Sequence, residues 1–147
     1  MSEHNLSGKK VAFLLTDGVE QVELTSPWDA VKEAGGVPTL VSPKSGELQG
    51  YDGTEKGQRF AVDLAVGRAD AADFHALVIP GGVVSGRNLT SYHTLQTDLR
   101  NAGAIWTNEE VVVDQGLVTS RSPRDLPAFN AKLLEEIAEG EHAGQTP

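Results

Sequence analysis

The sequence contains no cysteine among its 147 residues. This absence excludes disulfides, thiolate metal sites and a cysteine nucleophile within these residues. No apolar run approaches the roughly 20 residues that a helix needs to cross a bilayer, which argues against a membrane protein. The four histidines, His4, His75, His93 and His142, show no paired ligand spacing, so we expect no metal site.

Clustered basic residues are also missing. The formal net charge is -9, and Lys9-Lys10 is the only adjacent basic pair. Because affinity for a phosphate backbone comes mainly from clustered lysine and arginine, we expect no nucleic-acid partner. The first ten residues lack the apolar core of a signal peptide, which favours a cytoplasmic location. The length suits one domain over residues 1–147.

Short apolar runs are typical of strands covered on both faces. "VAFLL" at 11–15, "VPTLV" at 37–41 and "ALVIP" at 76–80 fit this pattern, and we expect the last of them to be a third buried strand. In "RFAVDLAV" at 59–66 the apolar residues alternate, which predicts a half-exposed strand. The intervening residues, 42–58, are rich in turn formers and predict a loop with a short hairpin.

Helix signals follow the first strand and close the chain. Residues 16–36 predict a helix that ends at Gly35-Gly36 and is kinked at Pro27, although a second helix capped by Ser26 is an alternative. "VVVDQGLVTS" at 111–120 predicts a hairpin. A last helix should start at Ser122-Pro123, with apolar residues at helical spacing.

The order of these elements predicts an α/β sandwich, a mostly parallel sheet flanked by helices on both faces. In such sheets, sites lie at the carboxyl ends of strands. "TDGVE" follows the first strand and "PGG" ends the third, so the two segments should face the same edge.

Four blocks of the sequence resemble a known family, in the correct order. They are "VAFLLTDGVEQVELTSP", "HALVIPGG", "GRNLTSYHTLQTDLRNAGAIW" and "EEVVVDQGLVTSRSPRDLPAF". The chain resembles the PfpI-type intracellular proteases and deglycases, which belong to the superfamily of the Parkinson-associated deglycase and the class I glutamine amidotransferases. The resemblance implies a flavodoxin-like sandwich and a cysteine enzyme that needs no cofactor.

The chain departs from this family after Pro80-Gly81-Gly82. There the family has a helix, a buried strand and a sharp turn that presents a Cys-His pair, whereas here only "VVS" precedes "GRNLTS". A crossover helix with its strand takes about 30 residues or more, so one internal helix-strand unit is missing near residues 83–87. Loss of a central strand would expose ladder hydrogen bonds and apolar faces.

Three explanations for this gap are open. The natural polypeptide contains a segment that the present sequence omits, which we favour; or a true deletion folds by re-pairing its strands and leaves a non-catalytic protein; or the chain is designed or spliced. An unbroken backbone through positions 83 to 87 inside a fully paired sheet would argue against the first explanation.

The resemblance implies roles for three residues. Glu20 matches the family's acidic partner of the cysteine, and the amides of Gly81 and Gly82 would hold the oxyanion formed when sulfur adds to a carbonyl carbon. From spacing alone Glu20 has another interpretation, because Asp17-Gly18-Val19-Glu20 also has capping-box spacing. The glycine pair can likewise be a simple turn.

Other candidates are interpreted as structural. Glu23 should be a solvated or interface charge, and His93 a surface residue where a short strand leads into a helix. Asp114 belongs to the hairpin turn, and Trp28 and Trp106 are core or contact aromatics. Ser85 is disfavoured as a replacement nucleophile, because the G-x-S-x-G pattern is absent.

Two classes of function follow. The resemblance implies a stress-protective cysteine hydrolase, with protease, deglycase or glyoxalase chemistry on a peptide or small-molecule substrate, and a homo-oligomer. The alternative is a non-catalytic oligomerising or chaperone-like relative. The sequence does not choose the substrate.

Overall fold

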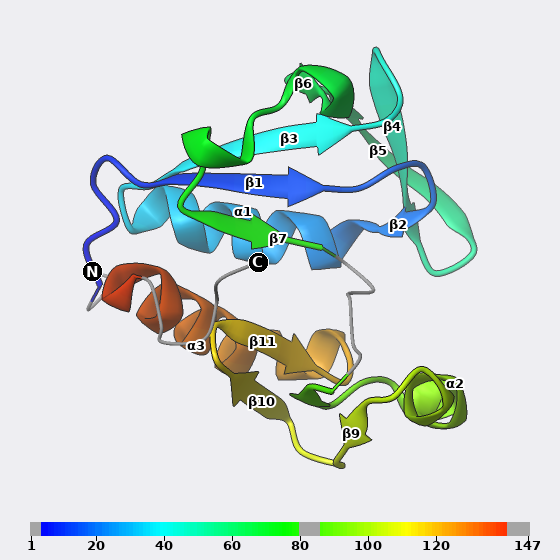
Figure 1. The fold of residues 1–147 in the computed structure, drawn as a ribbon. Coiled ribbons are helices and arrows are strands. Elements are labelled where there is room, and N and C mark those ends of the chain that lie inside the picture. The colour runs from blue at the N-terminus through cyan, green and yellow to red at the C-terminus, as the bar shows by residue number, and fades with distance from the viewer. Residues whose placement is uncertain (1–3, 80–85, 141–147) are drawn as a thin grey trace. The chain divides into compact units, whose positions relative to one another are not determined.

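The computed structural model describes residues 4–79 and 86–140, and its chain divides into two compact units, 1–81 and 82–147 (Figure 1). Each unit is described by itself. The boundary between the units directly precedes the stretch at which the sequence departs from the family pattern. That both units form one domain stays a prediction. Of the predicted junction near residues 83–87, positions 83–85 lie outside the described residues, and the predicted test of an unbroken backbone lies outside them too.

A parallel sheet forms the centre of the N-terminal unit. Its strands are β1 (Lys10–Leu14), β3 (Val37–Ser42), β6 (Leu64–Ala65) and β7 (Ala76–Val78), in the order β6-β3-β1-β7. Each neighbouring pair is parallel. The predicted α/β class with a parallel sheet is therefore confirmed.

The two faces of this sheet differ. Phe13 lies opposite Leu40 on β3 and Val78 on β7, and all three are buried. The Phe13 ring contacts Trp28 of α1 (Gln21–Glu33), with the ring centroids 5.1 Å apart. Because side chains alternate along a strand, the neighbours of Phe13 point to the face away from α1.

Helix α1 is continuous from Gln21 to Glu33 and includes the buried Pro27, so the prediction of one helix rather than two is confirmed. The helix ends where the sequence predicted. Gly35 has a φ of 87° and donates to the Lys32 carbonyl, and Gly36 donates to the Val31 carbonyl. These bonds satisfy carbonyls that the last helical turn would leave unpaired.

The segment 59–66 does not form the single strand that its alternation predicted. β5 (Glu55–Ala61) pairs antiparallel with β4 (Glu47–Asp52), and β4 pairs with β2 (Val19–Glu20) in a separate three-stranded sheet. Leu64 belongs to the central sheet instead. The chain turns at Asp63, whose side chain accepts from the Leu40 amide at 2.8 Å and whose own amide donates to the Leu40 carbonyl.

Strand β7 is not the fully buried strand that "ALVIP" predicted. Leu77 is 57% exposed, although Val78 is buried. Among the described residues, β7 pairs with β1 and with no second strand. Two short 3-10 turns, η1 (Val66–Arg68) and η2 (Ala71–Asp73), precede it. Within the described residues, β7 is therefore an edge strand that carries an exposed apolar side chain.

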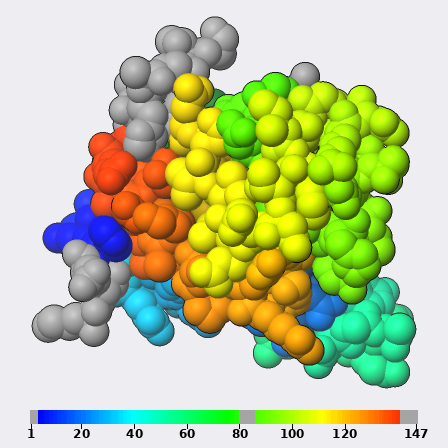
Figure 2. Space-filling model, turned by 90° about the horizontal axis from the view of Figure 1, so that it is seen from below, coloured from blue at the N-terminus to red at the C-terminus, as the bar shows by residue number. Residues whose placement is uncertain are grey.

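The C-terminal unit contains two small pairs of strands. β8 (Asn88–Leu89) pairs with β9 (Ile105–Trp106), while β10 (Val111–Asp114) and β11 (Leu117–Ser120) form the predicted hairpin. Between β8 and β9 lie η3 (His93–Leu95) and α2 (Gln96–Asn101). Figure 2 shows the surface of this unit, with the yellow-green α2 beside the yellow segment that contains β9.

The last helix begins with η4 (Pro123–Asp125) and continues as α3 (Leu126–Glu139), as predicted. Its buried side chains are Leu126, Leu133, Leu134 and Ile137. Contacts of α3 with β10 and β11 give this unit its own core. No helix among the described residues is long and apolar enough to span a membrane.

Candidate functional site

The carboxyl end of β1 is tied to the β4-β5 hairpin by a series of hydrogen bonds. Asp17 accepts from the Gln49 amide at 2.9 Å and from Lys44 Nζ at 2.6 Å. Gln21 Oε1 accepts from the Gln58 amide at 2.7 Å. These bonds hold the loop after β1 and the start of α1 against one hairpin, so the side chains between them have defined positions.

Glu20 belongs to the same set of contacts. Its two carboxylate oxygens lie 3.2 and 3.3 Å from the Gly53 amide, in the turn between β4 and β5. The capping-box interpretation is wrong, because α1 begins at Gln21 with Glu20 as its N-cap residue and no side-chain cap forms. Asp17, the expected cap, bonds to the hairpin instead.

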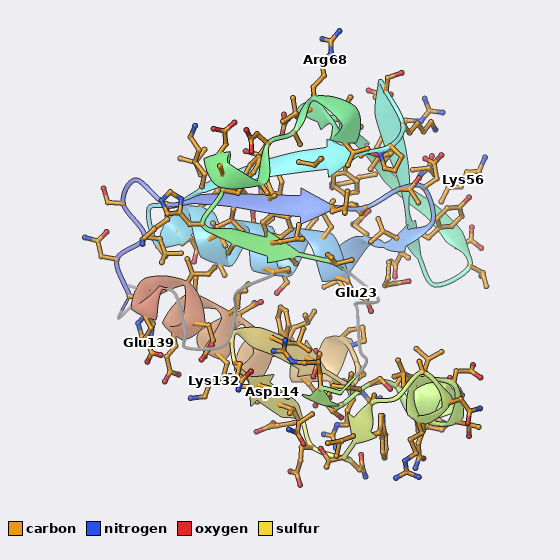
Figure 3. The ribbon with its side chains drawn as sticks, viewed as in Figure 1. Glu23, Lys56, Arg68, Asp114, Lys132 and Glu139 are labelled. Carbon is orange, nitrogen blue, oxygen red and sulfur yellow. The ribbon has the colours of Figure 1, made fainter. Side chains whose placement is uncertain are left out.

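Figure 3 labels Glu23 near the start of α1. Glu23 follows Glu20 by three residues, about one helical turn, and its environment differs from that of Glu20. Its side chain is half-buried rather than solvated, and no hydrogen bond to its carboxyl group occurs within the described ranges. Burial raises its pKa above the usual 4.5, and the charge of Glu20 raises it further. The structure therefore places a carboxyl group that holds its proton more tightly at the carboxyl end of β1.

Sequence reasoning missed this carboxyl group as a functional candidate. The signal was the spacing, because carboxylates three residues apart at a helix start share one face and repel each other. A pair of carboxyl groups with different environments is a common arrangement for proton transfer in enzyme sites.

The remaining predicted site residues do not join this pair. Gly81, Gly82 and Ser85 lie outside the described residues. His93 begins η3 shortly after β8, where it was predicted, and its ring lies 4.6 Å from that of Tyr92. Trp28 packs in the N-terminal unit, as described above.

Trp106 contributes to a polar contact in the C-terminal unit. Its Nε1 donates to Ser91 Oγ at 2.9 Å, and the Arg100 guanidinium lies 5.5 Å from its ring centroid. These contacts join β9 to the segment before η3 and to α2. They support the prediction of a structural aromatic.

Asp114 ends β10 and makes more contacts than a turn residue needs. Its Oδ2 accepts from the Asn88 amide at 2.6 Å and from the Asn88 side chain at 3.1 Å. Arg87 lies 3.6 Å from the same oxygen and donates to the Asp114 carbonyl. The Asn88 amide first, and Arg87 in addition, lower the pKa of Asp114. Asp114 thus fastens β8 to the hairpin.

No group of three or more potential metal ligands occurs in residues 4–79 and 86–140. The polar contacts include side chains bonded to backbone amides, such as Glu20 to Gly53, and ion pairs such as Arg121 with Asp125. The chemistry available in the N-terminal unit is that of the Glu20-Glu23 pair at the strand end.

The profile of the DJ-1/PfpI family matches this chain in two stretches, residues 9–85 and 82–136. The chain belongs to the DJ-1/PfpI family. This confirms the resemblance inferred from the four sequence blocks. The two matched stretches overlap at 82–85, directly after the boundary between the two compact units.

Curated relatives align over almost their full length. YraA of Bacillus subtilis, a protein provisionally named as a cysteine protease, is 33% identical over 167 positions. The alignment covers 86% of this chain and 96% of YraA. General stress protein 18 of Bacillus subtilis is 33% identical over 169 positions. Protein/nucleic acid deglycase 2 of Escherichia coli is 32% identical over 171 positions. For both proteins the coverage is again 86% of this chain and 96% of the relative.

These alignments measure the gap. In each, 86% of the 147 residues is about 126 residues, whereas the aligned positions number 167 to 171. About 40 to 45 positions of each relative therefore have no counterpart in this chain. This length exceeds the roughly 30 residues of one helix-strand unit.

Solved structures share the fold. A two-domain protein of Anabaena variabilis, with DJ-1/ThiJ/PfpI-like and ferritin-like domains, is 26% identical with a TM-score of 0.78; the match covers 95% of this chain and 52% of that protein. DJ-1 of Schizosaccharomyces pombe has a TM-score of 0.73 at 18% identity, over 88% of this chain and 92% of that one.

Proposed function

We propose that the natural polypeptide is a stress-protective cysteine hydrolase, and that its nucleophile lies on a segment of about 40 residues that the 147-residue chain lacks. The observation that carries this proposal is the gap itself. Relatives named as a cysteine protease and as a deglycase have 40 to 45 positions in total without a counterpart here, and the family profile matches in two stretches that join at 82–85.

The described residues retain a carboxyl pair suited to such chemistry. In the proposed reaction, a thiolate adds to a carbonyl carbon of an acyl group or an aldehyde, and the carbonyl oxygen becomes an oxyanion. Backbone amides at Gly81 and Gly82 would stabilise that oxyanion. Glu23, whose raised pKa favours the protonated form, would share its proton with the sulfur, and Glu20 would hold α1 to the Gly53 turn.

This assignment moves the proton-sharing role from Glu20 to Glu23. The Glu20 carboxylate already accepts from a backbone amide. Glu23 makes no such bond in the described part of the chain, so its carboxyl group is available to a group supplied by the absent segment.

A chimera tests the proposal. The positions of YraA that have no counterpart here would be inserted between Val84 and Ser85, and the product assayed with glyoxal, a glycated peptide and a fluorogenic peptide. We expect turnover of at least one substrate, loss of that turnover when the inserted cysteine becomes serine, and at least a tenfold loss in Glu23→Gln. A folded chimera inactive on all three substrates would contradict the proposal.

The mass of the natural protein gives an independent test. The present chain has a mass of 15.6 kDa, and 40 to 45 further residues of the same mean mass would add about 4 to 5 kDa. We expect the heavier mass from intact-protein spectrometry of material from its native source. A mass of 15.6 kDa would instead favour a true deletion.

The absence of cysteine favours one second candidate, a non-catalytic oligomerising or chaperone-like member of the family. Suppression of aggregation of a heat-labile client by the 147-residue chain, with no turnover by the natural protein, would support it. We place the active protein in the cytoplasm, as a homo-oligomer that acts on a small-molecule or peptide substrate without a cofactor.

A further inference from the structure

An apolar hollow lies on the face of the N-terminal sheet that points away from α1. It has a volume of about 390 Å³, and its lining includes Ala12 and Leu14 of β1, Val41 of β3 and Leu77 of β7, with Val66 and Phe74 at its side. Since Phe13 packs on α1, its neighbours Ala12 and Leu14 point to the opposite face. Among the described residues of this unit, only the short turns η1 and η2 line this stretch of the sheet face, and no α-helix does.

The open edge of the same sheet adjoins the hollow. The Lys10 carbonyl accepts from the His75 amide, on the side of β7. The Lys9 carbonyl and the Leu15 amide bond to Val37 and Val41, on the side of β3. The backbone N–H and C=O groups of even-numbered residues in β1 therefore point toward β7. Ala12 lies opposite Leu77, and in a parallel ladder it bonds to the two residues that flank Leu77. The N–H and C=O groups of Leu77 thus point away from β1, toward the side where β7 has no partner strand within the described residues.

Connection handedness relates the hollow to this edge. α1 links β1 to β3, which lies on the side of β1 away from β7. A chain continuing from β7 to a new strand beyond it moves across the sheet in the opposite direction. Because such crossovers are right-handed in about 98% of cases, the linking helix would cover the face opposite α1. The hollow lies on that face.

We infer that the N-terminal unit of the 147-residue chain binds, in trans, a helix-strand segment of a full-length DJ-1/PfpI relative, with the helix in the hollow and the strand on the open edge of β7. The inference rests on the proposed function in one respect, because both take the positions that this chain lacks to form one helix-strand segment. The 40 to 45 positions are long enough for one helix and one strand.

The test uses a synthetic peptide with the positions of YraA that have no counterpart here. We expect a 1:1 complex by native mass spectrometry and titration calorimetry, with hydrogen exchange of the Leu77 amide slowed at least tenfold at saturation. The control is the same peptide with proline at two central positions of its predicted strand, which should not slow that exchange.

Two variants locate the site. Leu77→Glu places a charge on an exposed position, so the fold should persist, and affinity should fall at least tenfold. Ile105→Glu, on a strand of the C-terminal unit and 55% exposed, is the matched control and should leave affinity unchanged. Circular dichroism and thermal melting check that both variants are folded.

Absence of binding by the folded chain would overturn the inference, as would equal losses in the two variants. So would a stable dimer whose Leu77 amide is protected without peptide, because a second copy would then occupy the edge. If the chimera is active but the peptide does not bind, the proposed function is supported and the binding inference is wrong. If the peptide binds but the chimera is inactive, the binding inference is supported and the proposed function is contradicted.

Discussion

Glu20 and Glu23 lie one turn apart at the start of α1, and they use their carboxyl groups differently. Glu20 accepts from the Gly53 amide, whereas Glu23 is half-buried without a hydrogen bond among the described residues. Burial, and then the charge of Glu20, raises the pKa of Glu23. The folded state is therefore destabilised as Glu23 ionises, because its charged form is partly buried and lies near Glu20.

Glu23→Gln should stabilise the 147-residue chain at pH 7 and leave its stability unchanged at pH 3. A carboxyl group with a raised folded-state pKa destabilises the fold as pH rises from its usual 4.5 through the folded value. We expect a gain of about 0.5 kcal/mol, because a neutral amide avoids the cost of burying a carboxylate and also relieves the repulsion from Glu20. Urea unfolding of both proteins at the two pH values measures it, and a loss of stability at pH 7 would contradict the argument.

Gly57→Ala should destabilise the N-terminal unit through Gln21. A Cβ atom at position 57 would clash with the Gln21 side-chain amide, whose oxygen accepts from Gln58. We expect a cost of about 1 kcal/mol, the value of one lost hydrogen bond. In the Gln21→Ala background, Gly57→Ala should cost much less. Equal costs in the two backgrounds, measured by chemical unfolding, would show that Gln21 is not involved.

Gln115→Asn should stabilise the C-terminal unit. Gln115 and Gly116 both have positive φ, 46° and 81°, in the two-residue turn between β10 and β11. Such a turn strongly prefers Asn-Gly, because asparagine tolerates the left-handed region better than glutamine. We expect a gain of about 0.5 kcal/mol and, in the control Gly116→Ala, a loss of about 1 kcal/mol. Thermal melting compares the three proteins.

Asp125→Asn should destabilise the C-terminal unit at neutral pH. The buried Asp125 accepts from Arg121 Nε at 3.0 Å and from a second guanidinium nitrogen at 3.1 Å. Arg121 lowers the pKa of Asp125 below the usual 3.8, so the stability that Asp125 contributes is present above pH 3.8 and is lost as pH falls through the folded value. We expect a cost of about 2 kcal/mol at pH 7, the value of a hydrogen bond to a charged group. Urea unfolding should show this difference shrinking toward pH 2, and a difference independent of pH would contradict it.

Most single elements could be predicted because their signals are local. The glycine pair at 35–36 ends α1, and the turn at 115–116 forms the hairpin, since both depend on the φ values that a few adjacent residues allow. The segment 59–66 could not be predicted as well. The alternation of apolar residues in this segment is equally compatible with one strand or two. The segment is divided at Asp63, whose hydrogen bonds are to Leu40, far away in the sequence.

The acidic segment after β1 was chosen as a candidate site from the sequence, and its catalytic role stays a prediction. The bond of Glu20 to Gly53 and the partial burial of Glu23 were not predicted. Which carboxylate meets the Gly53 amide depends on how the β4-β5 hairpin folds back on the start of α1. No spacing within residues 17–23 contains that information.

Motif order and strand periodicity are properties of the chain, so the family, the parallel α/β class and the place of the missing unit could be inferred without coordinates. The exposure of Leu77 and the apolar hollow opposite α1 became visible in the folded chain alone. Burial is a property of neighbours, and the neighbours of β7 are set by pairing between distant segments.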